Sequence, residues 1–188
     1  LTGNAGGGTG SDANQVGLDL SATTITSSGG GNITLEGTGK ANSGGNNFGI
    51  LIANSSQITT PGGDISLTGN GGGVLGSNTS NQVGLDILAT TISTSGTGTV
   101  SLVGNGGNTP GFDNKGIRIS GNTQVSSVNG DITLTGQGGT PSSGGTFGQV
   151  GIDISGSTIS STGSGAITFS GTAGAAGGQN NKGILFTN

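Results

Sequence analysis

Short segments in which apolar residues alternate with polar ones, called apolar pulses below, recur along the whole chain. The stretch 151–171, which reads GIDISGSTISSTGSGAITFSG, contains three of them, at residues 152–154, 158–160 and 167–169. Within each pulse, aliphatic or aromatic residues alternate with Ser, Thr or Asp, so one face is apolar and the other polar. This period of two, bounded by Gly and Ser, predicts short β-strands with one buried face. No window has the three- and four-residue apolar spacing of a helix.

The pulses belong to an internal repeat. A glycine that opens the first pulse of each unit occurs at positions 17, 49, 84, 116, 151 and 183. The gaps alternate between 32 and 35 residues, which defines a double repeat of 67 residues built from two similar halves. A period of this size is typical of repeat architectures, in which each unit is stable only against its neighbours.

Three short strands per unit predict an all-β fold, a parallel β-helix (β-solenoid) in which each unit makes one coil. We expect residues 1–188 to form a single array that is a window of a longer repeat region, because Leu1 matches Leu67 in mid-repeat. Gly-rich loops should connect the strands of successive coils, and an insertion there, for example at Gly72, should cost little stability. Stacked aliphatic columns should form the core, with one column through Leu18, Ile50, Leu85, Ile117, Ile152 and Ile184.

An antiparallel hairpin is the alternative for one part of each unit. Residues 124–134 have two apolar pulses around Asn129-Gly130, a favoured hairpin turn. The equivalent turns are Pro61-Gly62-Gly63 and residues 95–98, which differ in length and type. This variation favours a corner between two stacked strands over a fixed two-residue turn.

Composition excludes several function classes. The chain has 46 Gly among 188 residues, is only 27% hydrophobic and 6% charged, and has a net charge of −4 with only four basic residues. The scarcity of basic residues argues against a nucleic-acid partner or an anionic membrane surface. Cys and His are absent, which removes thiolate metal sites, disulfides and the usual general base. No apolar run is long enough to span a membrane. We therefore expect no cofactor and no enzymatic activity.

The repeat pattern G-[IL]-x-[IL] … [TQ]-[IV]-[ST] … G-x-[IV]-[TS]-[LF]-x-G, followed by a Gly/Asn-rich loop, carries a resemblance over nearly all 188 residues. It resembles the β-strand repeats of large secreted bacterial surface proteins, the filamentous-haemagglutinin-like adhesins. The resemblance implies a right-handed parallel β-helix at the cell surface or outside the cell, with a stalk, adhesive or filament-forming role. Head-to-tail stacking of the chain on itself is the expected association, with a surface polysaccharide as a further candidate partner.

Outward hydroxyl columns are the first candidate binding feature. One column is expected at Thr34, Ser66, Ser101, Thr133 and Thr168, and a second at Thr26, Thr59, Ser93, Ser126 and Ser160. Flat Thr ladders on solenoids serve ice binding, and hydroxyl ladders also suit carbohydrate, so an ice-binding or carbohydrate-binding solenoid is the alternative function. Ser and Thr are equally common as plain exposed strand residues.

Charged residues form the second candidate feature. Asp86, Arg118 and Asp153 occupy the same outward position in successive coils, where Arg118 is expected to bridge the two carboxylates. Asp19 shares that position, but carboxylates about 9.6 Å apart with another residue between them suit neither a catalytic pair nor a shared metal. Asp12 and Asp113 lie in Gly/Asn loops similar to calcium-binding repeats but lack their spacing, which favours turn formation instead.

Overall fold

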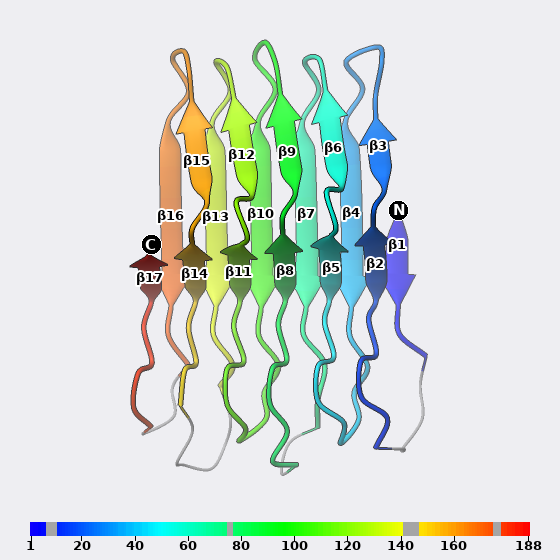
Figure 1. The fold of residues 1–188 in the computed structure, drawn as a ribbon, viewed down its shortest axis with the longest axis vertical. Coiled ribbons are helices and arrows are strands. Elements are labelled where there is room, and N and C mark those ends of the chain that lie inside the picture. The colour runs from blue at the N-terminus through cyan, green and yellow to red at the C-terminus, as the bar shows by residue number, and fades with distance from the viewer. Residues whose placement is uncertain (7–10, 75–76, 141–146, 175–177) are drawn as a thin grey trace.

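The computed structural model describes residues 1–6, 11–74, 77–140, 147–174 and 178–188, and parts of four predicted loops lie outside these ranges. Its strands form three parallel sheets that run side by side along one solenoid, as predicted (Figure 1). Sheet A contains β1 (Thr2–Asn4), β4 (Ile33–Thr38), β7 (Ile65–Asn70), β10 (Val100–Asn105), β13 (Ile132–Gln137) and β16 (Ile167–Thr172).

The other two sheets complete each coil. Sheet B contains β2 (Leu18–Ser21), β5 (Ile50–Ala53), β8 (Leu85–Leu88), β11 (Ile117–Ser120), β14 (Ile152–Ser155) and β17 (Ile184–Thr187). Sheet C contains β3 (Thr24–Thr26), β6 (Gln57–Thr60), β9 (Thr91–Thr94), β12 (Gln124–Ser127) and β15 (Thr158–Ser161). The chain passes through sheets B, C and A in turn, so each strand pairs with its counterpart one coil away.

The hairpin alternative is wrong. Strands β12 and β13, which would have formed it, lie in different sheets and pair only with strands of neighbouring coils, all parallel. The residues around Asn129-Gly130 therefore form a corner. Backbone contacts between coils stabilise this corner, since the Asn129 N–H donates to the Gly96 carbonyl at 2.8 Å.

The core consists of stacked aliphatic columns. Residues that share a column pair in register from strand to strand, as Leu85, Ile117 and Ile152 do. These three side chains have no exposed surface, whereas Leu18 and Ile184, at the two ends of the same column, are only half-buried and exposed respectively. The difference follows from the stacking, because an end coil has a neighbour on one side only.

Glycines occur where a strand of sheet A and the next strand of sheet B approach each other closely. A Cβ on Gly104, near the end of β10, would overlap the carbonyl oxygen of Gly116, which precedes β11. Gly116 has no room either, because a Cβ there would lie 2.6 Å from the Gly104 oxygen. The glycines that revealed the repeat are thus required by close packing of the backbone.

Buried hydroxyls close the corner between sheets B and C. The Ser56 Oγ donates to the Ala53 carbonyl oxygen at 2.6 Å, lies 3.0 Å from the Leu20 carbonyl oxygen, and accepts the Thr23 N–H at 3.0 Å. Two coils later, Thr123 occupies the same position and donates to the Ser120 carbonyl at 2.7 Å. These side chains satisfy backbone groups that leave the strand ladders at the corner.

The Gly-rich loops are regular where they adjoin the strands. Next to the strands they carry a column of fully buried amide side chains, formed by Asn47, Gln82, Asn114 and Gln149. The Asn114 Oδ1 accepts the Gln82 N–H at 3.0 Å, so the side chain of one coil holds the backbone of another. Gly72, the proposed insertion point, is buried and donates its N–H to the Asn47 carbonyl at 2.9 Å. The inner part of each loop is therefore a second, polar core.

Candidate interaction surfaces

The predicted hydroxyl column lies on the outer face of sheet A. Its members pair in register across five successive strands, and each stands between two inward-facing residues. Thr34 and Thr168 are exposed, while the three middle members are half-buried. The column is regular in spacing but mixed in chemistry and exposure, so it offers hydrogen-bonding groups without a uniform Thr surface.

The second hydroxyl column follows sheet C and borders a shallow groove. The groove has a volume of about 430 Å³ and is lined by Ser27, Thr59, Thr60, Pro61, Ser93, Thr94 and Ser95. None of these side chains titrates near neutral pH. The groove can therefore donate and accept hydrogen bonds, but it has no general acid or base of its own.

The predicted charge column is present, with a different pairing. Asp86, Arg118 and Asp153 lie in register on β8, β11 and β14. Arg118 makes two hydrogen bonds to Asp86, from Nε to Oδ1 at 2.8 Å and from Nη2 to Oδ2 at 2.6 Å. The expected second bond to Asp153 is absent, because the Lys115 Nζ lies 2.8 Å from the Asp153 Oδ2 and pairs with it instead.

Burial strengthens the pair between Arg118 and Asp86. Asp86, predicted to point outward into solvent, is only 6% exposed. The hydrogen bond with Asp86 raises the pKa of Arg118 above its ordinary value, against the opposing effect of burial. The guanidinium also lies over the Phe48 ring, 5.8 Å from its centroid. Arg118 is thus fixed by a carboxylate and by an aromatic ring of another coil.

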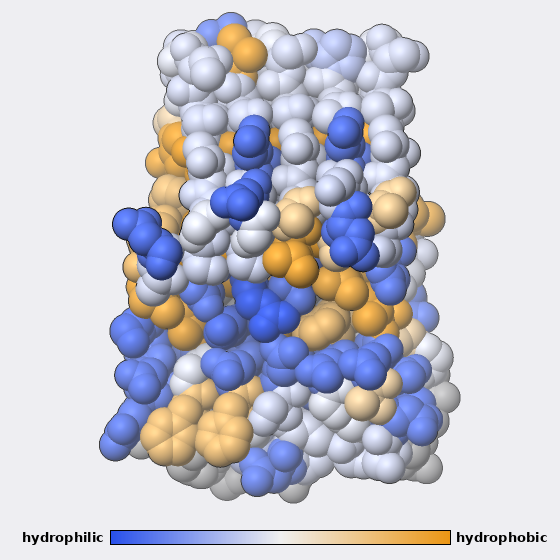
Figure 2. All heavy atoms as spheres, in the orientation of Figure 1, coloured by the Kyte–Doolittle hydropathy of each residue, from blue (hydrophilic) through white to orange (hydrophobic). Residues whose placement is uncertain are grey.

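An asparagine ladder, which the sequence analysis missed, leads to this pair. Asn14, Asn46 and Asn81 occupy the same position in successive coils and all have a left-handed backbone, with φ near +60°. Asn46 donates to Asn14 at 3.0 Å, Asn81 donates to Asn46 at 2.7 Å, and Arg118 donates to Asn81 at 2.9 Å. Figure 2 shows a band of hydrophilic side chains across this part of the surface, below the strands.

The carboxylates considered for metal or acid–base chemistry are dispersed. Asp12 lies 3.7 Å from Lys40, and Asp113 lies 3.7 Å from Lys115, so each has a basic partner. Residue Leu51 stands between Asp19 and Asp86 in the column of sheet B, as the repeat predicted. Within the described ranges, no cluster of three or more Asp or Glu residues could hold a metal ion.

No helix in the described part of the chain is long and apolar enough to cross a membrane. Comparison with protein-family models, with curated proteins and with solved structures finds no match to this chain. The geometry of the solenoid and its repeat pattern are therefore the features from which a function is inferred.

Proposed function

We propose that this chain is a non-enzymatic structural or adhesive β-solenoid of an extracellular or cell-surface protein. The solenoid serves as a stalk or filament segment, in which stacked coils carry both the core and the surface. Two observations support the proposal: the parallel three-sheet fold, and the resemblance of its repeat to those of the filamentous-haemagglutinin-like adhesins.

The exposed ends of the aliphatic columns carry the proposal. Ile117 and Ile152 have no exposed surface in the middle of the solenoid, but Phe186 is 59% exposed at one end and Leu1 is 68% exposed at the other. The strands of each end coil also leave one row of backbone N–H and C=O groups unpaired. Such edges are templates for another strand, and a head-to-tail contact between copies does not close into a ring. Stacking of coils is thus the association that this chain favours.

The strand count sets a condition on that stacking. Among the described residues, sheets A and B have six strands each, whereas sheet C has five. A second copy placed head to tail continues sheets A and B and leaves sheet C one strand short at the joint. The strand register aligns Thr187 with Ser120, so Asn188 corresponds to the residue after Ser120. It also aligns Leu1 with Leu134. A segment equivalent to residues 122–133, which contains β12, would complete the joint.

The experiment compares the 188-residue chain with a variant that has a copy of residues 122–133 appended after Asn188. Sedimentation velocity and negative-stain electron microscopy should show short oligomers for the first and long filaments for the second. In a matched control, the appended copy has Asp in place of the residues that correspond to Val125 and Ile132. This control should form only short oligomers, as the 188-residue chain does. Strictly monomeric behaviour of both chains at high concentration would contradict the proposal.

A further inference from the structure

Several departures from the repeat lie together at one place on the solenoid surface. Residues 112–118 read FDNKGIR, whereas the same half-repeat reads GNNFGIL at 45–51 and QNNKGIL at 179–185. In the other half-repeat, Phe147 and Gly148 stand where earlier units have Ser-Asn and Ala-Asn. In a repeat protein the constant positions maintain the stack, so neighbouring exceptions in successive coils mark a specialised surface.

The exceptions place two aromatic rings next to each other. Phe112 and Phe147 occupy the same position in successive coils, since the Asn81 N–H donates to the Phe112 carbonyl and the Asp113 N–H to the Phe147 carbonyl. Their ring centroids are 5.6 Å apart and their planes differ by 30°. The two residues are 45% and 40% exposed, so both rings remain accessible in a chain that has only five Phe and no Tyr or Trp.

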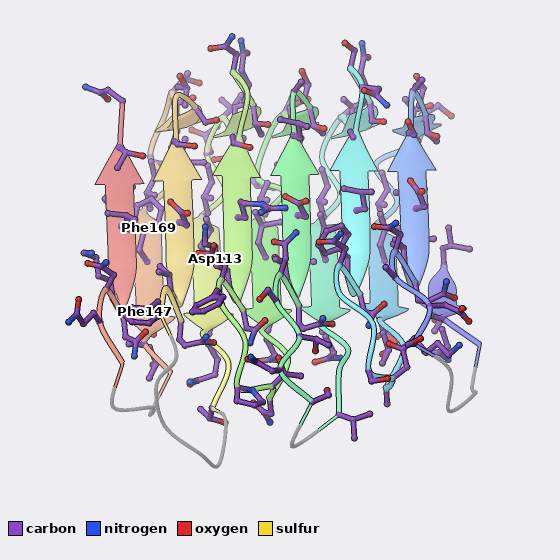
Figure 3. The ribbon with its side chains drawn as sticks, turned by 60° about the horizontal axis from the view of Figure 1, so that its bottom comes forward. Asp113, Phe147 and Phe169 are labelled. Atoms are coloured by element: carbon purple, nitrogen blue, oxygen red, sulfur yellow. The ribbon has the colours of Figure 1, made fainter. Side chains whose placement is uncertain are left out.

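Polar groups lie beside the rings. Asp113 replaces an asparagine of the ladder and keeps its left-handed backbone, and Gly148 leaves room for it, since a Cβ there would lie 2.5 Å from the Asp113 Oδ1. Asp113 and Phe147 come from neighbouring coils on the loop side of the strands (Figure 3). Lys115 lies 3.7 Å from Asp113 and 2.8 Å from Asp153. The Lys115 side chain is only 14% exposed, so it holds the two carboxylates in place, whereas the Asp113 side chain is 57% exposed. The surface thus combines two exposed rings with a carboxylate acceptor.

Charge limits the class of ligand. Of the four basic and eight acidic residues in the chain, two and three respectively lie in this region: Lys115 and Arg118, with Asp86, Asp113 and Asp153. The region is therefore slightly acidic within an acidic protein, which disfavours anionic polymers. A neutral hexopyranose presents an apolar C–H face for the rings and hydroxyl groups for the polar rim.

We propose that the Phe112–Phe147 pair, with the neighbouring Asp113 carboxylate, binds a neutral polysaccharide. The ring separation suits two consecutive sugar units of an extended chain, one stacked on each ring. Asp113 accepts a hydrogen bond from a sugar hydroxyl, and Lys115 keeps the Asp113 carboxylate in position. The inference deepens the adhesive part of the proposed function and rests on it. It does not depend on stacking, because the two rings lie along the side of the solenoid, away from its end coils.

The test is affinity electrophoresis of the 188-residue chain in gels that contain a soluble neutral glucan, a galactomannan or polygalacturonate, followed by calorimetry with any polymer that retards it. We expect retardation by a neutral polymer and none by the anionic one. Phe112→Ala and Phe147→Ala should each weaken binding about tenfold, since each removes one stacked ring. The matched control is Leu88→Ala, which truncates a side chain of similar exposure, 41%, at another corner and should leave binding unchanged.

A second variant separates the ligand classes. Asp113→Asn restores the residue of the other coils and keeps an acceptor, so neutral-sugar binding should persist while discrimination against polygalacturonate weakens. Loss of binding in this variant would indicate a cationic ligand and would overturn the inference. So would a wild-type chain that no neutral polymer retards, or Phe variants that bind as wild type does. Sedimentation of the same variants reports stacking separately, so the failure of one proposal is distinguishable from the failure of the other.

Discussion

The solenoid has two cores, an apolar one under the strands (the strand side) and a polar one in the inner loops (the loop side). Each is built from columns that take one residue from every coil. On the strand side, the column through Leu85, Ile117 and Ile152 exchanges Leu and Ile freely, because apolar contact has no direction. On the loop side, the buried column alternates Asn and Gln without exception among its four fully buried members. A hydrogen bond requires a specific donor and acceptor geometry, so the polar column tolerates less variation.

The largest difference between the two sides should come from a charge in the apolar column. Ile117→Asp places a carboxylate among fully buried aliphatic side chains and should lower the free energy of unfolding by more than about 4 kcal/mol. Denaturant titration followed by circular dichroism measures the change. Thr135→Asp, on the exposed face of β13, is the control and should cost little. Equal stability of the two variants would show that the column is not the core.

The polar column should lose less. Asn114→Ala removes the acceptor for the Gln82 N–H and the donor to the Thr109 carbonyl, which leaves two buried backbone groups without this partner. We expect a loss of roughly 2 kcal/mol. Gln124→Ala removes an exposed amide and should change stability by less than about 0.5 kcal/mol. If Asn114→Ala matched that control in denaturant titration, the loop side would be a surface feature and not a second core.

The smallest effect should come from an exposed polar link at a turn. Asp64 accepts hydrogen bonds from the Thr99 N–H and Oγ1, and these bonds lower the pKa of its carboxyl group. A carboxylate with a lowered folded-state pKa stabilises the fold above its unfolded pKa, and this contribution disappears as pH falls through the folded value. Asp64→Asn should therefore slightly flatten the decrease in melting temperature below about pH 4.

A partial variant checks the cause of this pH dependence. Thr99→Val removes the hydroxyl donor and keeps the backbone N–H, so its effect on the acid limb should lie between those of wild type and Asp64→Asn. A melting temperature with the same pH dependence in all three proteins would show that the link does not contribute.

The repeat period made most of the strand side predictable. Residues 32 or 35 apart must stack once one coil is known, which placed Asp86 beside Arg118 and aligned both hydroxyl columns. Asn14, Asn46 and Asn81 are also 32 and 35 residues apart, so the period aligns them. The ladder was missed because a left-handed backbone has no hydropathy signal.

Side-chain reach could not be predicted in the same way. The long side chain of Lys115 pairs with Asp153 although the two residues do not share a column, whereas Arg118 keeps to Asp86. The period gives the positions of backbones, but not the choice among several charged neighbours.

The direction of the backbone hydrogen bonds has a mechanical consequence. In all three sheets these bonds connect one coil to the next, and the two termini lie at opposite ends of the stack (Figure 1). A pull on the termini therefore loads the coils in series, so the chain yields one coil at a time at a force set by the weakest coil. Each released unit of 32 or 35 residues adds roughly 110 Å of extended chain. Under tension we therefore expect the chain to lengthen in steps and to dissipate energy at each step, while the remaining coils stay folded.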